Sequence, residues 1–161
     1  MDGVAFRDLS FGDAGWIIQR HAESYAAAEG FDARFEALVI GIMDRYLRER
    51  DPSCERAWIA HRGAERLGSI FCVKGGAPGL AKLRLFFVEP AARGQGLGRT
   101  LLALCLDHAR AAGFRRMTLW THESHRAACA LYAGTGFRIV SSRPVRNFGC
   151  DLVEQAWEIA L

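Results

Sequence analysis

The residues best suited to chemistry form a glycine-rich stretch, Arg93-Gly94-Gln95-Gly96-Leu97-Gly98-Arg99-Thr100. It follows an apolar, strand-like run over residues 83–88, closed by Glu89-Pro90. After it, apolar residues recur every four positions, at Leu97, Leu101, Cys105 and Ala109. This order predicts a strand, a turn and a helix. The first N–H groups of a helix lack internal partners and lie at the positive end of its dipole, so we predict a phosphorylated ligand here.

Two common phosphate-binding motifs do not fit this stretch. A P-loop ends in Gly-Lys-Ser/Thr, whereas here its lysine would be Arg99 and its first glycine Arg93. A dinucleotide fingerprint read from Gly94 or Gly96 would have Arg99 or Leu101 as its third glycine. Nucleotide binding of either kind is therefore not indicated.

A second motif lies further along the chain, where Leu131-Tyr132 precedes Gly136-Phe137. Together with residues 93–100 it resembles the GNAT superfamily of acyl-CoA-dependent N-acetyltransferases. Segments such as Gly12-Asp13-Ala14-Gly15-Trp16 and Met117-Thr118-Leu119-Trp120-Thr121 are similar to the acetyltransferase module often fused to MarR-type regulators. The chain is expected to be a stand-alone form of that module.

The resemblance implies acetyl-CoA as the co-substrate and assigns its contacts. Backbone amides of the turn would hold the diphosphate, and the Val88 N–H would polarise the thioester carbonyl. A splayed pair of strands would expose the backbone edge of Phe86 and Val88 to the pantetheine arm. The predicted cofactor-binding residues are Phe86, Phe87, Val88, Arg93, Gly94, Gln95, Gly96, Leu97, Gly98, Arg99, Thr100 and His125.

Two residues are candidates for proton transfer. Tyr132 matches the family tyrosine that reaches the cofactor sulfur, and a phenol with a pKa of about 10 suits protonation of a departing thiolate. It is alternatively an aromatic anchor of its helix. Glu89, close to the reacting edge, is the predicted general base, or else faces solvent. The strand glutamate of some family members falls near Lys82, so that base is absent.

The acceptor is expected to lie against a polar and aromatic stripe of the first helix. His21, Tyr25 and Glu29 follow one another at helical spacing, with Trp16 beside them. Glu29 would pair with an amine cation and His21 would relay its proton. Such a stripe is alternatively ordinary packing with satisfied polar ends.

Two histidines, His122 and His125, replace residues that are commonly asparagine in the resembled families. Each is a cofactor contact, a base or an exposed loop residue, and sequence alone leaves these roles open. A metal site is not indicated, because His-x-x-His has no third ligand nearby.

The elements that position these residues follow from apolar spacing and turn residues. Helices are predicted over 13–28, with Asp13 as N-cap and Gly30 after its end, and over 32–49, with Asp32 as N-cap. Two more are predicted over a span beginning near 97 and over 124–133. Strands are predicted over 4–7, 56–61, 67–73, 83–88, 116–121, 138–145 and 154–161. The result is a mixed α/β, GNAT-like sheet of six to seven strands with four helices and a central splayed parallel pair. Trp58, Trp120 and Trp157 are predicted to lie in the core.

Composition bounds the remaining possibilities. With 161 residues, half of them apolar, a single domain over 1–161 is expected. No apolar run approaches the roughly 20 residues of a membrane span, and no signal-peptide pattern is seen. Five cysteines without a C-x-x-C pair favour a reduced, cytoplasmic protein. A net charge of +3, spread along the chain, argues against nucleic acid. A homodimer is the default assembly.

Two functions from different classes remain. The first is an acetyl-CoA-dependent N-acetyltransferase that uses an unidentified amine-bearing acceptor, by direct attack in a ternary complex. The alternative is a non-catalytic acyl-CoA-binding regulatory module, which the lack of an obvious base favours. A DNA-binding role is weakest, because no helix-turn-helix pattern is present.

Overall fold

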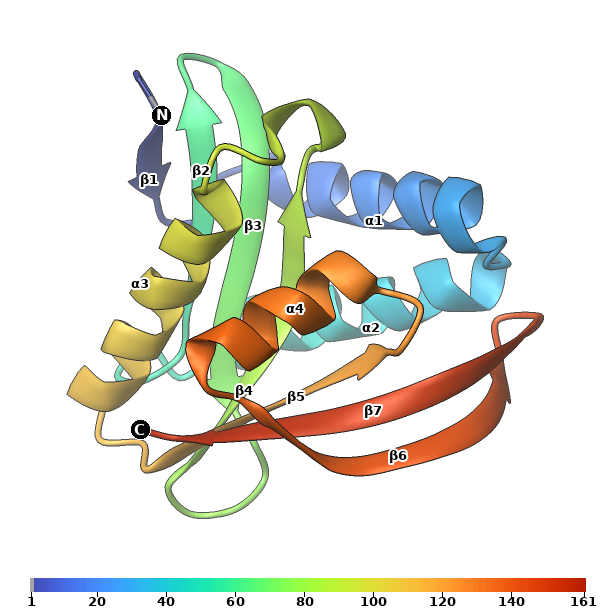
Figure 1. Cartoon of the computed structure of the whole chain (residues 1–161). Helices are drawn as coiled ribbons and strands as arrows, with labels where there is room; N and C mark the ends of the chain where they lie inside the picture. Colours follow the sequence, from blue (N-terminus) through green and yellow to red (C-terminus); the bar gives the residue numbers. More distant parts are fainter. Residues whose placement is uncertain (1) are drawn as a thin grey trace. The chain divides into compact units, whose positions relative to one another are not determined.

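The computed structural model describes residues 2–161 (Figure 1). Its elements are β1 (Ala5–Arg7), α1 (Asp13–Glu29), α2 (Ala33–Glu49), β2 (Arg56–Arg62), β3 (Glu65–Lys74), β4 (Leu80–Val88), the short 3₁₀ helix η1 (Pro90–Ala92), α3 (Leu97–Ala111), β5 (Arg116–His122), α4 (Arg126–Thr135), β6 (Arg138–Asn147) and β7 (Cys150–Ala160). Over these residues the strands form one seven-stranded sheet in the order β1-β2-β3-β4-β5-β7-β6, with β4 and β5 parallel. The predicted mixed sheet with four α-helices is confirmed.

The chain divides into two compact units, which are described in turn. The first unit holds the residues up to 13, then 51–118 and 160–161. The second holds 14–50 and 119–159, so β5 begins in the first unit and ends in the second. The single domain expected over 1–161 stays a prediction.

In the first unit, α3 packs along the β2–β3 hairpin and β4 (Figure 1). The central residues of β2 and β3 are buried, which explains their continuous apolar runs. The residues of α3 predicted to face the core are buried, namely Leu97, Leu101, Cys105 and Ala109. The helix is therefore held by its apolar face, and its position fixes the glycine-rich turn that precedes it.

Gly68 of β3 is tightly packed against β4 and α3. A Cβ built there would lie 2.7 Å from the Phe87 backbone oxygen and 3.1 Å from Leu101 Cδ1. Gly68→Ala is therefore expected to destabilise the fold by about 1–3 kcal/mol, the usual cost of overpacking.

The matched control is Gly41→Ala in the middle of α2, where a Cβ would meet nothing within 4 Å among the described residues. Alanine favours a helix interior over glycine, so this variant is expected to gain about 0.5–1 kcal/mol. Urea unfolding curves measure both effects. Equal shifts of the two variants would contradict this account of Gly68.

A bulge interrupts β4 where it pairs with β3. The register shifts between Ser69 and Phe71, and Leu85 takes a positive φ of 45°. The buried Ser69 hydroxyl donates to the Leu85 carbonyl at 2.8 Å, which satisfies a group that the bulge takes out of the ladder. The bulge therefore changes the direction in which the residues from Phe86 onward point.

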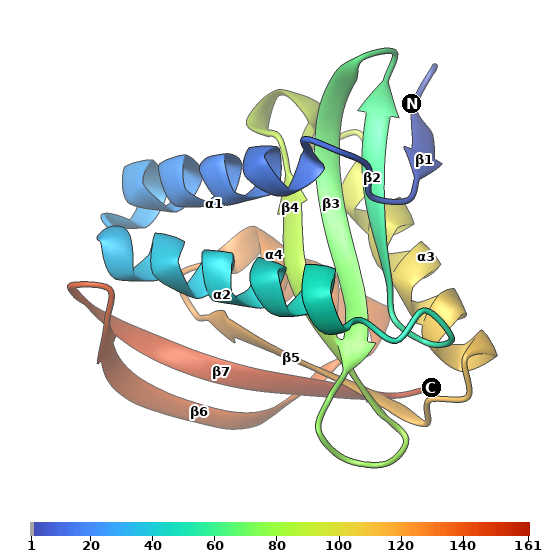
Figure 2. The ribbon, with the colours of Figure 1, turned by 180° about the vertical axis from the view of Figure 1, so that it is seen from behind.

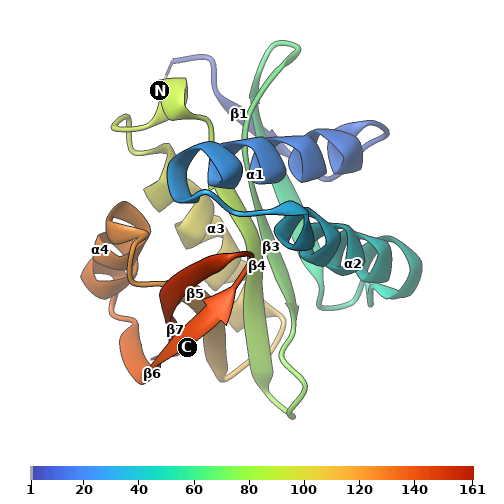
Figure 3. The same ribbon diagram turned by 90° about the vertical axis from the view of Figure 1, so that its right-hand side faces the viewer.

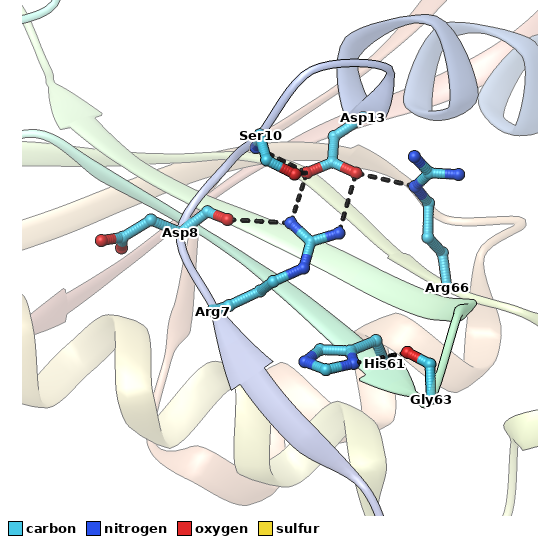
Figure 4. Close-up of polar contacts among 7 residues, drawn as sticks. All are labelled: Arg7, Asp8, Ser10, Asp13, His61, Gly63 and Arg66. Atoms are coloured by element: carbon cyan, nitrogen blue, oxygen red, sulfur yellow. Dashed lines mark hydrogen bonds and ion pairs between the residues drawn. The ribbon is translucent and has the colours of Figure 1, made fainter.

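Asp13 anchors the start of α1 in the first unit (Figure 4). Its carboxylate, with no exposed surface, accepts from Arg7 at 2.6 and 3.0 Å and from Arg66 Nε at 2.7 Å. The Ser10 N–H donates to it at 2.7 Å, and the Asp13 N–H donates back to the Ser10 carbonyl. Asp13 was predicted to be the N-cap; instead the helix begins at Asp13, whose carboxylate accepts from the Ser10 N–H three residues earlier, as in one half of a capping box.

In the second unit, α1 and α2 lie side by side (Figure 2). Asp32 caps α2 as predicted, its side chain accepting from the Arg34 N–H. The α1–α2 junction lies beside the turn between β6 and β7 (Figure 3), where the Asp32 N–H donates to the Phe148 carbonyl at 3.0 Å. Residues far apart in the sequence therefore meet around residues 29–32.

One predicted core residue is on the surface. Trp58 and Trp157 are buried as expected, but Trp120 is 58% exposed. Its neighbours Leu119 and Thr121 are buried, and alternation along β5 turns Trp120 to the other face. The prediction treated all strand tryptophans alike and ignored this alternation. Among residues 2–161, the structure has no helix long and apolar enough to cross a membrane.

Candidate functional site

The glycine-rich turn joins η1 to α3 in the first unit. Gly94 and Gly96 have left-handed φ values of 76° and 83°, and Gly96 caps α3 with no side-chain hydrogen bond from the described chain. A Cβ at either glycine would meet no atom within 4 Å in that part of the chain. Backbone conformation, and not crowding, therefore requires glycine at these positions.

The N-terminus of α3 offers hydrogen-bond donors. The Thr100 N–H makes the first helical bond, to the Gly96 carbonyl at 3.1 Å. The N–H groups of residues 97–99 precede this bond and have no acceptor within the helix. Together with the positive end of the helix dipole, they form a set of donors suited to an anionic group such as a phosphate.

Two predicted ligand-binding side chains also stabilise the turn. Arg93 Nε donates to the Val88 carbonyl at 3.0 Å, and Gln95 Nε2 donates to the Ala91 carbonyl at 3.3 Å. Arg93 and Arg99 are both exposed beside the turn. The Arg93 side chain therefore ties the turn to the end of β4.

The end of β4 presents a backbone donor on the side away from β3. Glu89 N–H donates to the Leu67 carbonyl at 2.8 Å, and Val88 is opposite Gly68. Hydrogen-bonded and non-hydrogen-bonded pairs alternate along an antiparallel ladder, so the Val88 N–H points away from β3. The β4–β5 ladder covers Leu80–Lys82. The predicted roles of Phe86, Phe87 and Val88 remain predictions, and this orientation is compatible with them.

The two predicted catalytic residues occupy different units. Glu89, half-buried, follows β4 in the first unit, where it occupies the N-cap position of η1 without a side-chain cap hydrogen bond in the described structure. Tyr132, on α4 in the second unit, is 5% exposed, and its ring lies 5.8 Å from that of Phe137 and 6.1 Å from that of Trp157. The aromatic anchoring considered for Tyr132 is therefore present, and its catalytic role stays a prediction.

The predicted acceptor stripe on α1 meets His125 in the second unit. The rings of His21 and Tyr25 stack at 6.2 Å, and those of Tyr25 and His125 are 4.8 Å apart. Glu29 Oε1 lies 3.3 Å from His125 Nε2. Trp16, five residues before His21, is half-buried. The structure thus brings three of the four predicted acceptor residues together with His125, which was predicted to contact the cofactor.

Sequence reasoning missed the aromatic residues around these side chains. The ring of Phe31 lies 5.7 Å from His122, 5.1 Å from Phe35 and 5.0 Å from Phe148. His122 is half-buried at the end of β5 and so is not the exposed loop residue considered above. No spacing signal links these residues, because they come from separate segments of the chain.

The histidines of this group are held neutral near pH 7. Burial lowers the pKa of His21 to about 4, partly offset by its hydrogen bond to the Ile17 carbonyl. Burial also lowers the pKa of His125 to about 4, opposed by Glu29 and reinforced by His122. The pKa of His122 is lowered by burial, against the attraction of Glu154 and Glu29. Neutral imidazoles present one acceptor nitrogen each.

Comparison with known proteins defines the class to which this fold and turn belong. The sequence profile of the Acetyltransferase (GNAT) family matches residues 24–137, and the chain belongs to that family. It is 34% identical over 102 residues to a mycothiol acetyltransferase of Geodermatophilus obscurus, covering 58% of this chain and 33% of the relative. The chain spans about a third of the length of the curated relatives that it matches first.

Solved structures agree on the fold. A ribosomal-protein-alanine N-acetyltransferase from Brucella melitensis superposes with a TM-score of 0.79 at 21% identity, covering 98% of this chain and 99% of that one. A putative acetyltransferase from Salmonella typhimurium, solved with its cofactor acetyl-CoA, superposes with a TM-score of 0.76 at 21% identity, covering 99% of this chain and 95% of that one. The family's co-substrate is acetyl-CoA, as the sequence resemblance implied.

Proposed function

We propose that the chain is an acetyl-CoA-dependent N-acetyltransferase that acetylates a primary amine of a small molecule or peptide. The observation that carries this is the α3 N-terminus, which lacks a side-chain cap in the described structure and follows two left-handed glycines. It comes shortly after a strand whose Val88 N–H points away from β3. The amine attacks directly, in a ternary complex.

Each residue has a defined part in this proposal. Acetyl-CoA supplies the activated acyl group. The N–H groups of residues 97–99 hold its diphosphate, and the Val88 N–H stabilises the developing oxyanion, worth about 3–4 kcal/mol for one such donor. Glu89 accepts the proton of the attacking amine, and Tyr132 donates a proton to the departing sulfur.

Gly96→Ala tests the cofactor half of the proposal. Alanine disfavours a φ of 83°, so the turn is expected to rearrange and the N–H groups to lose their common direction. The affinity for coenzyme A, measured by calorimetry, is expected to fall at least about tenfold, or about 1.4 kcal/mol.

Gly113→Ala is the matched control for this experiment. Gly113 has a φ of 84°, and a Cβ there would also meet nothing within 4 Å of the described atoms. It follows the opposite end of α3, so it carries the same backbone strain away from the turn. Its coenzyme A affinity is expected to match the wild type. An equal loss in both variants, or none in either, would count against the turn as the diphosphate site.

The regulatory module remains the second candidate, favoured by the packing of Tyr132 against Phe137 and Trp157. The two functions differ in thiol release from acetyl-CoA. An acetyltransferase releases coenzyme A with at least one member of an amine panel. Tight binding without release across the panel would favour the module.

A further inference from the structure

A group of polar side chains lies within the aromatic part of the second unit. We call Glu29, His122 and His125 the histidine cluster. Glu29 ends α1, His122 ends β5, and His125 immediately precedes α4. The two imidazole rings meet edge to face at 5.5 Å, and Glu29 Oε1 lies 3.3 Å from His125 Nε2. The side chains of His125 and Glu29 are only 13% and 15% exposed.

Two nitrogens of this cluster are shielded without a hydrogen bond in the described structure. They are His122 Nδ1 and His125 Nε2. Glu29 is within ion-pair distance of His125 Nε2, but the two atoms lack hydrogen-bond alignment. The other nitrogen of His125 lies 3.2 Å from the Thr121 hydroxyl. A shielded polar atom without a partner costs free energy, so its presence requires a reason such as a ligand.

The side chains packed around the cluster are aromatic. The Tyr25 ring lies 4.8 Å from that of His125, and Phe31 contacts both histidine rings at 5.7 and 6.5 Å. Phe35 and Phe148 extend the wall behind Phe31. Such rings attract an organic cation through their faces and an apolar group through burial of its surface.

The charges around the cluster favour a cation. The groups that face the histidines are Glu29 from α1 and Glu154 from β7, together with the other histidine. Glu154 is already paired with Arg143, whose Nη2 lies 3.0 Å from Glu154 Oε1. At neutral pH the imidazoles carry no charge, so the Glu29 carboxylate sets the sign. An anionic or strongly polar ligand would meet repulsion and an apolar wall.

We propose that the histidine cluster binds the ammonium group of an acceptor whose attached body is apolar and aromatic. This rests on the proposed acetyltransferase function, since it names the substrate class of that reaction. Because His125 Nε2 is shielded and lies 3.3 Å from Glu29, the two side chains must separate on binding. The ammonium then donates to His125 Nε2 and pairs with Glu29, while the rings of Tyr25 and Phe31 contact the body. The predicted acceptor stripe is thereby extended to residues of β5 and of the β6–β7 turn.

A binding experiment on the full chain tests the proposal without relying on turnover. The probes are phenethylamine and 2-phenylethanol, which share a ring and a chain but differ in the ammonium. The histidine ring signals are followed by NMR during titration. Phenethylamine is expected to shift the signals of His122 and His125 and to bind at least about tenfold more tightly than the alcohol.

Glu29→Gln removes the charge and keeps the shape. This variant is expected to bring the amine's affinity close to that of the alcohol. Glu23→Gln is the control, because it removes a carboxylate from the exposed side of α1, where Glu23 contacts Gln19 and Arg20. Its preference for the amine is expected to stay unchanged. Equal binding of the two probes to the wild type, or no binding of either, would overturn the proposal.

The failure of this proposal differs from that of the proposed function. Calorimetry with coenzyme A and thiol release with other amines report on the function alone. Coenzyme A binding with acetylation of polar amines, but no preference for phenethylamine over the alcohol, would overturn only the acceptor class. Phenethylamine binding without coenzyme A binding would support the amine site but overturn the proposed acetyltransferase function.

Discussion

Asp13→Asn is expected to lower the free energy of unfolding by about 3 kcal/mol, at the lower end for breaking a buried ion pair. Asparagine retains the volume of aspartate but leaves the guanidinium groups of Arg7 and Arg66 without their shared counter-charge (Figure 4). The expected loss is moderated because the side chains of these arginines are 33% and 30% exposed and are therefore partly solvated. Urea unfolding with the m-value held constant measures the change.

The same ion pairs predict a pH dependence. Burial alone would raise the pKa of Asp13, but hydrogen bonds from Arg7, Arg66 and the Ser10 N–H outweigh it and hold the pKa well below its usual value. A carboxyl group whose pKa is lower in the folded protein than in the unfolded chain stabilises the fold at pH values above its unfolded pKa, which is near 3.9. That contribution is lost as the pH falls from there toward the folded pKa. The stability gap between wild type and Asp13→Asn is therefore expected to be constant above about pH 5 and to narrow below pH 4.

Asp44→Asn provides the control for charge removal at an exposed pair. Asp44 contacts Arg48 one turn along α2, and both side chains are more than half exposed. Its unfolding midpoint is expected to move far less than that of Asp13→Asn. Two results would show that the Asp13 carboxylate is not the stabilising group. One is an equal shift of the unfolding midpoint in Asp13→Asn and Asp44→Asn. The other is a stability gap between wild type and Asp13→Asn that does not narrow below pH 4.

Local patterns in the sequence predicted most of the fold. The four-residue spacing from Leu97 to Ala109 places the buried face of α3 correctly. Asp32 and Gly30 bound the two N-terminal helices as their residue types suggest. Element ends were less accurate, since β4 begins at Leu80 and not Leu83, and α4 begins at Arg126 and not Ser124. Strand ends depend on partners elsewhere in the chain, which spacing does not encode.

The part of the candidate site that sequence analysis predicted is the part formed by residues adjacent in the sequence. The glycine-rich turn carries its own signal, because left-handed φ and helix N-terminal donors need neighbouring residues only. The grouping of Phe31, His122 and Phe148 depends on packing between distant segments, and no motif marks it. The finer likeness to the MarR-linked module remains a prediction from sequence, beyond the family itself.

Tyr132→Phe is expected to lower kcat at least about a hundredfold, because it removes the proposed proton donor to the departing sulfur. The phenyl ring keeps its position between Phe137 and Trp157, so packing is retained. The affinity for coenzyme A is expected to change little, and the melting temperature by less than about 2 °C. Thiol-release kinetics with a saturating amine, calorimetry and thermal unfolding give the three measurements.

Tyr132→Leu separates chemistry from packing. It removes the ring from a side chain that is 5% exposed, so stability is expected to fall as well as kcat. If the Tyr132 hydroxyl is catalytic, Tyr132→Phe loses activity but keeps its stability, whereas Tyr132→Leu loses both activity and stability. The pH profile adds an independent readout, since removal of an essential acid abolishes the alkaline limb that its ionisation produces. If the phenylalanine variant kept wild-type kcat and the same pH profile, Tyr132 would be a packing residue of α4 alone.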